Sequence, residues 1–178
     1  MAGSRNGYNL DVMPLTEPIT ALTDYAITVV SLVFASAMYR RIESGNRVVA
    51  WLWCAAFLAT AAAAMAGGTF HGLRMHLRHA VLDTLWKSTL FLAGAAVAFV
   101  VAAIHGAQVR RKDHTMAWLA GSIAVTIAGL AVQQSEFPRG MFLNHNDIYH
   151  LIQLVALYLL FRCARTTRDR GHAAMIGT

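Results

Sequence analysis

The chain has 178 residues, of which 57% are hydrophobic and only 13% are charged, and this is too apolar for an ordinary soluble domain. Its formal net charge is +6, which we attribute to the topology of a membrane protein and not to nucleic-acid binding. The composition predicts a protein whose main partners are membrane lipids.

Five apolar stretches follow one another, and none carries more than one charged residue. They are Ile19–Tyr39, Val48–Phe70, Thr84–Ile104, Thr115–Gln134 and Ile148–Phe161, the last extending through Asp147 and Arg162. A bilayer core needs about 20 helical residues, and unbroken runs exclude the alternating strands of a barrel. We predict an all-α membrane protein, a compact bundle of five transmembrane helices. Its domain spans residues 19–163, between a tail at 1–18 and a basic tail at 164–178.

Lysine and arginine residues set the predicted orientation. Ten of them follow the first, third and fifth stretches or precede the second, whereas five lie on the opposite side. Because basic residues accumulate in the cytoplasm, we predict an extracytoplasmic N-terminus and a cytoplasmic C-terminus in a bacterial inner membrane. Both cysteines then fall at the cytoplasmic end, where a reducing environment predicts free thiols.

The first stretch begins with a candidate cap and contains one acid. Pro18 suits the first turn of a helix, with Thr16 before it as the cap. Asp24 lies beyond that turn, with Thr20 and Thr28 one turn away on either side. Asp24 either reaches water at the interface or points inward; a lipid-facing acid is costly, so we predict the inward position.

The second and third stretches meet at the same outer end. The second ends in Gly67-Gly68-Thr-Phe-His71, and Asp83 follows twelve residues later at the start of the third. Asp83 and Lys87 are four residues apart, so a plain salt bridge is an alternative to a catalytic role for Asp83.

The last outer loop supplies two more histidines. Asn144 or Asn146 can cap the final helix, and Asp147 suits its first turn. Capping does not explain His150, which lies inside the membrane helix. His145 is five residues earlier, so the two histidines can share one ion only if His145 belongs to the loop.

Zinc prefers three or four nitrogen, oxygen or sulfur ligands. His71, His145 and His150 are the predicted ligands, with Asp24 and Asp83 as the predicted catalytic acids that activate or orient water. The sequence therefore predicts a zinc site at the outer end.

Small residues recur at every fourth position of three helices and predict close helix packing. They are Ala55, Ala59, Ala63 and Gly67; Gly94, Ala98, Ala102 and Gly106; and Ala120, Ala124 and Ala128. The same ridges are candidates for a homo-oligomer interface.

Two resemblances are carried by these motifs. Glu17-Pro-x-Thr, Thr23-Asp-Tyr and Asn144-His-Asn-Asp-x-Tyr-His150 resemble a group of small, uncharacterised bacterial membrane proteins. His71, Asp83 and His150 also resemble the metal-site positions of the alkaline ceramidase/CREST superfamily of membrane zinc hydrolases. That family has Ser where this chain has Gly67, a final His pair one residue closer, and seven helices.

The resemblance implies a zinc-dependent hydrolase of a lipid amide or ester, and two alternatives remain open. A b-type cytochrome needs two axial histidines on facing helices, which His71 and His150 supply; His105 and His114 could hold a second haem at the inner end. A small ion- or proton-conducting oligomer is the other alternative, with acids and histidines as a relay.

Overall fold

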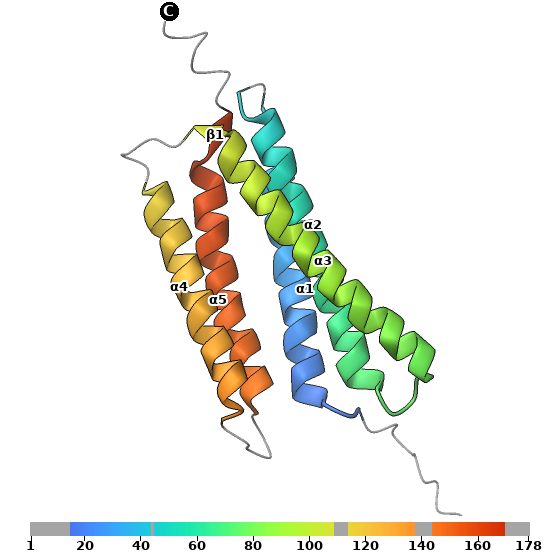
Figure 1. Cartoon of the computed structure of the whole chain (residues 1–178). Helices are drawn as coiled ribbons and strands as arrows, with labels where there is room; N and C mark the ends of the chain where they lie inside the picture. Colours follow the sequence, from blue (N-terminus) through green and yellow to red (C-terminus); the bar gives the residue numbers. More distant parts are fainter. Residues whose placement is uncertain (1–14, 44, 109–113, 138–143, 170–178) are drawn as a thin grey trace, which may run out of the picture.

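A computed structural model describes residues 15–43, 45–108, 114–137 and 144–169 (Figure 1). Over these residues the chain forms five long helices, each long and apolar enough to cross a membrane. The helices are α1 (Pro18–Tyr39), α2 (Arg47–Leu73), α3 (His79–Gly106), α4 (Thr115–Ser135) and α5 (His145–Thr166). The predicted five-helix bundle is confirmed, and most helices extend a few residues beyond their apolar runs.

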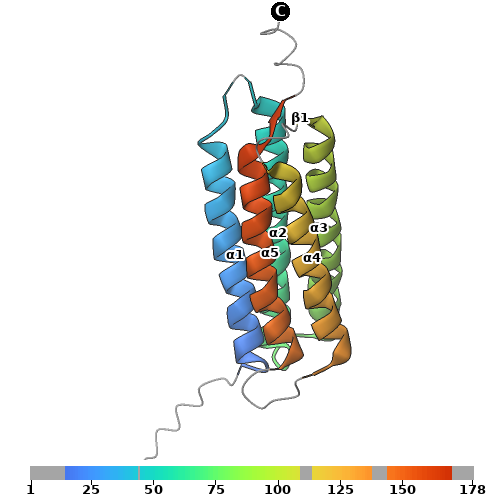
Figure 2. The ribbon, with the colours of Figure 1, turned by 90° about the vertical axis from the view of Figure 1, so that its left-hand side faces the viewer.

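The helices alternate in direction and fall into two groups (Figures 1 and 2). In one group α2 packs against both α1 and α3, and in the other α4 packs against α5; α1 also packs against α5 and so joins the groups. We call the end where α1, α3 and α5 begin the polar end, and the opposite end the arginine end. Which end faces the cytoplasm stays a prediction.

Aromatic side chains join α1, α2 and α5 in the half nearer the arginine end. Phe34 on α1 stacks on Phe161 on α5 with ring centroids 4.1 Å apart, and Phe57 on α2 meets both rings edge-on. Trp53 is fully buried beside them, and its indole N–H donates to the Thr167 hydroxyl at 2.9 Å. Cys54 and Cys163 are buried in the same region as free thiols, as predicted.

The small-residue ridges have different fates. On α2, Ala59, Ala63 and Gly67 are buried, so this ridge packs helices together as predicted. On α3 the prediction is wrong within one chain, because Ala98 is exposed and a side chain added at Gly94 would meet nothing within 4 Å. The ridge on α4 is exposed too. Only Ala96 and Ala103 of α3 are buried, and only Thr115, Ser122 and Gly129 of α4. Most of the surface of both helices therefore lies away from the core.

Two short strands, which the sequence did not predict, pair with each other at the arginine end. β1 (Ala107–Gln108) follows α3 and pairs antiparallel with β2 (Arg168–Asp169) after α5. The Asp169 carboxylate accepts hydrogen bonds from the backbone N–H groups of Val48 (3.1 Å) and Val49 (2.8 Å). The first turn of a helix has such unpaired donors, so a residue near the end of the chain caps α2.

Replacing Asp169 should therefore weaken the arginine end. Asp169→Ala removes the acceptor for two N–H groups and should lower the free energy of unfolding by about 1 kcal/mol. Thermal unfolding in detergent measures this change. Glu43→Ala is the control, because it removes an exposed acid from the same end. Within the described residues, the Glu43 side chain makes no hydrogen bond to a helix terminus. Equal effects of the two variants would contradict the capping role.

Candidate functional site

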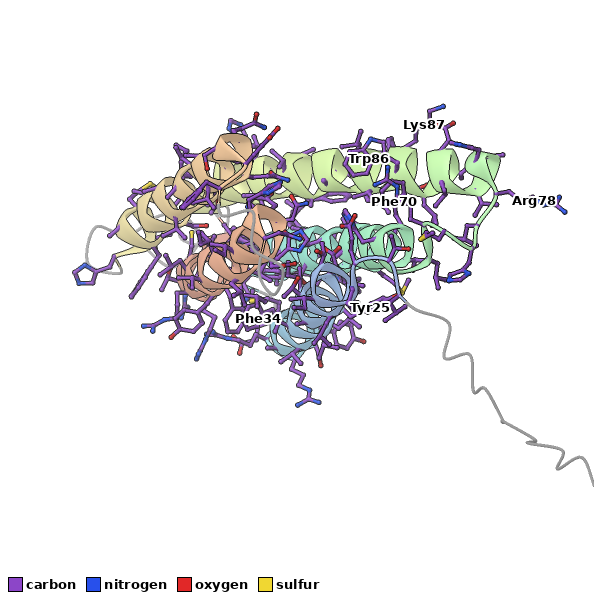
Figure 3. The ribbon with its side chains drawn as sticks, turned by 90° about the horizontal axis from the view of Figure 1, so that it is seen from below. Tyr25, Phe34, Phe70, Arg78, Trp86 and Lys87 are labelled. Carbon is purple, nitrogen blue, oxygen red and sulfur yellow. The ribbon has the colours of Figure 1, made fainter. Side chains whose placement is uncertain are left out.

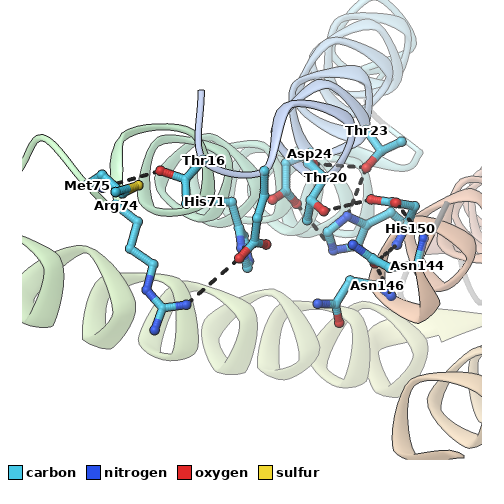
Figure 4. Close-up of polar contacts among 12 residues, drawn as sticks. Thr16, Thr20, Thr23, Asp24, His71, Arg74, Met75, Asn144, Asn146 and His150 are labelled. Atoms are coloured by element: carbon cyan, nitrogen blue, oxygen red, sulfur yellow. Dashed lines mark hydrogen bonds and ion pairs between the residues drawn. The ribbon is translucent and has the colours of Figure 1, made fainter. Parts of the chain in front are cut away.

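Seven polar side chains from α1, α2, α5 and the residue before α1 gather at the polar end (Figure 4). We call them the polar cluster: Glu17, Thr20, Thr23, Asp24, His71, Asp147 and His150. Of the acids and histidines predicted to gather at one end of the bundle, Asp24, His71, Asp147 and His150 belong to this cluster.

Asp24 and His150 form the buried centre of the polar cluster. Asp24 is 6% exposed and His150 is 9% exposed, which confirms the predicted inward position of Asp24. The Nε2 atom of His150 lies 3.5 Å from Asp24 Oδ1, and its Nδ1 atom lies 3.0 Å from the Thr23 hydroxyl. The other carboxylate oxygen, Asp24 Oδ2, is buried without a hydrogen-bond partner among the described residues.

Two glycines make room for this carboxylate. A side chain added at Gly67 would begin 3.4 Å from Asp24 Oδ2, and one added at Gly68 would begin 3.0 Å from Asp24 Cβ and 3.3 Å from the Ala21 carbonyl oxygen. Glycine permits a close backbone approach. The Gly-Gly pair therefore lets α2 lie against the face of α1 that carries Asp24.

His71 has a partner that the sequence analysis missed. Its Nδ1 atom lies 2.8 Å from Glu17 Oε2, and Arg74 approaches the other oxygen of Glu17 at 3.8 Å. The His71 ring lies 6.5 Å, centroid to centroid, from the ring of His150. Glu17 directly precedes Pro18 at the start of α1. This position, at the same end of the bundle as His71, was the sequence signal that could have identified Glu17 as a partner.

Thr16 does not cap α1, contrary to the prediction. The helix begins at Pro18 with Glu17 at the cap position and no side-chain cap bond. Thr16 instead accepts a hydrogen bond from the backbone N–H of Met75 at 3.3 Å and donates its own N–H to Gly72 at 3.2 Å. It ties the start of α1 to the loop after α2 and so helps to place Glu17 beside His71.

Asn144 caps α5 and Asp147 lies in its first turn, as predicted, and Asp147 also joins α5 to α1. Asn144 accepts bonds from the N–H groups of Asn146 and Asp147, while Asp147 accepts from the N–H of Asn144, which completes a capping box. The other Asp147 oxygen accepts from the Thr20 hydroxyl at 2.6 Å. Asp147 is 2% exposed, so one carboxylate fixes both the start of α5 and its contact with α1.

Two predicted site residues lie apart from this centre. His145 is the first residue of α5, and its Nδ1 atom is buried without a hydrogen-bond partner among the described residues. His145 could share an ion with His150 only from the preceding loop, and it does not lie in that loop. Asp83 pairs with Lys87 at 2.6 Å, with both side chains more than half exposed. Figure 3 shows Lys87 pointing away from the bundle.

The carboxylates and imidazoles of the polar cluster are side chains of the kinds that can bind protons or metal ions. Over residues 15–43, 45–108, 114–137 and 144–169, no three His, Cys, Asp or Glu side chains stand as a ready metal-binding group. Each cluster histidine nevertheless has its Nδ1 atom beside an oxygen, Glu17 for His71 and Thr23 for His150. Such partners fix the tautomer and orientation of a ring, as the outer partners of metal ligands do.

Comparison with known families bears on this arrangement. A model described as "Family of unknown function (DUF6962)" matches residues 19–109 and 88–169. The chain belongs to this family. The matched stretches reach from α1 to β2, which agrees with the predicted membership of an uncharacterised group. No curated protein and no solved structure matches the chain, so the resemblance to alkaline ceramidases stays a prediction.

Substitution of Gly68 tests whether α2 must lie this close to Asp24. Gly68→Ala places a methyl group 3.0 Å from Asp24 Cβ and 3.3 Å from a backbone oxygen, so α1 must shift and the free energy of unfolding should fall. Gly94→Ala is the matched control: its methyl group enters open space, and the helix should gain about 0.5–1 kcal/mol. Thermal unfolding in detergent compares them. A Gly68→Ala variant as stable as Gly94→Ala would contradict the tight approach.

Proposed function

We propose that this chain is a membrane-embedded, zinc-dependent hydrolase that acts on an amide or ester bond of a membrane lipid. Its metal site consists of Asp24, His71 and His150 at the polar end. Three protein ligands with a further position left for water are typical of catalytic zinc.

The spacing of Asp24 and His150 is the observation that carries the proposal. Two ligands at zinc bond lengths of about 2.0–2.2 Å and a tetrahedral angle lie about 3.4 Å apart. The distance between His150 Nε2 and Asp24 Oδ1 is 3.5 Å, longer than a good hydrogen bond and suited to a shared ion. Since an acid buried in a membrane helix is costly without a partner, the unpartnered Asp24 Oδ2 also favours a bound cation here.

His71 is the third ligand in this proposal. Its Nδ1 atom is engaged by Glu17, which leaves Nε2 for the metal. The rings of His71 and His150 are 6.5 Å apart, so loading has to bring His71 closer to the Asp24–His150 pair. His71 stands at the end of α2, with 18% of its side chain exposed, and has more freedom to move than the buried His150.

Zinc bound at this site would acidify a water molecule and polarise a carbonyl group. The protein's own contribution is to hold the ligands: Thr23 and Glu17 orient the rings, and Gly67 keeps space beside Asp24. With Asp24 Oδ1 as the ligand atom, Asp24 Oδ2 would be the group that accepts a proton from the attacking water. The resemblance of His71 and His150 to the ceramidase motif supports a hydrolase, whereas Asp83 pairs outward with Lys87, and Asp24 takes the role of the acid.

We further propose that the site lies on the extracytoplasmic side of a bacterial inner membrane, and the distribution of basic residues supports this. Among the described residues, more basic side chains lie at the arginine end than at the polar end. Those at the arginine end are Arg40, Arg41, Arg47, Arg162, Arg165 and Arg168, and those at the polar end are Arg74, Arg78 and Lys87. This bias is typical of a cytoplasmic arginine end.

Metal analysis tests the proposal directly. The purified protein should contain about one zinc ion per chain, and His150→Ala and Asp24→Asn should lose it together with hydrolysis of a panel of fluorogenic lipid amides and esters. His79→Ala is the control, because His79 is exposed at the start of α3 outside the polar cluster. Thermal unfolding in detergent shows that each variant is folded.

Three outcomes would overturn this function. Zinc that stays bound in His150→Ala places the site elsewhere. A protein without zinc even after reconstitution excludes the metal. A Soret band in the purified protein assigns the histidines to haem b, as in the cytochrome alternative.

The outer partners of the histidines give a graded prediction. Glu17→Gln and Thr23→Val should keep one zinc per chain but weaken its affinity by about 10–100-fold, the usual effect of losing such a partner. Chelator competition measures the affinity. Glu43→Gln, which neutralises an acid at the arginine end, should leave it unchanged. Unchanged affinity in Glu17→Gln would remove His71 from the proposed ligand set.

A further inference from the structure

An elongated apolar cleft of about 660 Å³ lies between the two helix groups, with α3 and α4 as its walls. Residues of α2 and α5, such as Ala63 and Leu157, also line it. Along α3 the lining runs from Ala93 to His105, which is about 18 Å of helix. The cleft therefore follows the direction in which lipid chains run across a bilayer.

The walls of the cleft offer few polar atoms to an occupant. The Thr60 hydroxyl donates to the Ala56 carbonyl oxygen at 2.9 Å, and the Ser122 hydroxyl donates to the Ala156 carbonyl oxygen at 2.9 Å. These hydroxyls are thus engaged by backbone, and the remaining lining is mostly Ala, Val, Ile and Leu. Such a surface suits a hydrocarbon chain and offers no built site for a charged ligand.

The cleft and the polar cluster meet on α5. Gln153 lines the cleft and stands three residues after His150, so the two side chains lie on neighbouring positions of one helix face. The same helix thus carries a buried histidine at the polar end and, from Gln153 to Leu160, one side of the cleft. A lipid whose head lies at the polar cluster can place its tail in the cleft.

We infer that the cleft between α3 and α4 binds one hydrocarbon tail of a lipid, with the head of that lipid at the polar cluster and the end of the tail toward His105. This inference rests on the proposed function for its reading of the head as substrate. Binding of a tail in the cleft does not depend on the proposed function. In a bundle of five helices long and apolar enough to cross a membrane, the opening of the cleft faces lipid chains. A helix of a second copy is the competing occupant.

Photolabelling tests the inference without activity or metal. Two long-chain fatty acids are used in detergent-solubilised protein, one with a diazirine near the carboxyl group and one with a diazirine near the chain end. The first should label cleft residues near Ile127 and the second those near Leu119, and excess unlabelled fatty acid should suppress both. Peptide mass spectrometry locates the labels.

Matched variants separate the cleft from general lipid contact. Ala93→Trp fills the cleft and should lower competable labelling on the order of tenfold, as overpacking of a site does. Ala98→Trp adds the same side chain to an exposed position of α3 outside the cleft and should leave labelling unchanged. On α4, Ile123→Trp and Ala124→Trp form a second such pair, in case Ala93→Trp does not fold.

Several results would overturn the inference. Labelling spread evenly over the exposed faces of α3 and α4, or not suppressed by competitor, removes the tail site. Labels in the reverse order along the cleft overturn the assigned direction. Protection of the cleft by a concentration-dependent dimer assigns it to a second copy. His150→Ala keeps the two proposals apart: it should lose zinc, whereas competable labelling near Leu119 by the probe with the diazirine near the chain end should persist. Failure of the metal site then leaves the cleft result standing.

Discussion

The polar contact between α1 and α5 is the interaction on which the rest of the arrangement depends. The α4–α5 pair meets the other three helices mainly through α1, and at the polar end this contact consists of Thr20 with Asp147, Thr23 with His150, and Asp24 with His150. Between helices in lipid, the hydrophobic effect gives little guidance, whereas each buried polar group needs a specific partner. These pairs fix how α5 is rotated and at what depth it meets α1.

The same contacts create the candidate site. Because His150 is bound on one side by Thr23 and faces Asp24 on the other, the residues that align the helices are also those that could hold an ion. The glycines of α2 add close packing against Asp24. Farther along the bundle the two groups are held by the stack of Phe34 and Phe161, and between α3 and α4 they leave the apolar cleft. A tight polar end beside an open apolar cleft is an arrangement suited to an amphiphilic ligand.

Local sequence patterns predicted much of this. The apolar runs gave the five helices, the cost of a lipid-facing acid gave the inward position of Asp24, and the Asn144–Asp147 pattern gave the cap of α5. Glu17 and Thr23 were not predicted as partners of the histidines. Thr23 lies on α1 and Glu17 directly before it, whereas His71 lies on α2 and His150 on α5, so no local pattern links them. The predicted packing of the ridge with Gly94 and Ala98 was wrong, because small residues allow close packing but do not determine whether a neighbouring helix is present.

The sequence by itself determined that the chain has five helices long and apolar enough to cross a membrane, and that Asp24, His71, Asp147 and His150 lie at the same end of the bundle. Both follow from local requirements: a backbone in lipid must satisfy its own hydrogen bonds, and alternating helices return to the same side. Only the tertiary structure decided which of those groups meet. Depth along a helix is set by position in the chain, but rotation about the helix axis is set by packing against neighbours. That rotation turns Asp24 and His150 toward each other and leaves Asp83 with Lys87 at the surface.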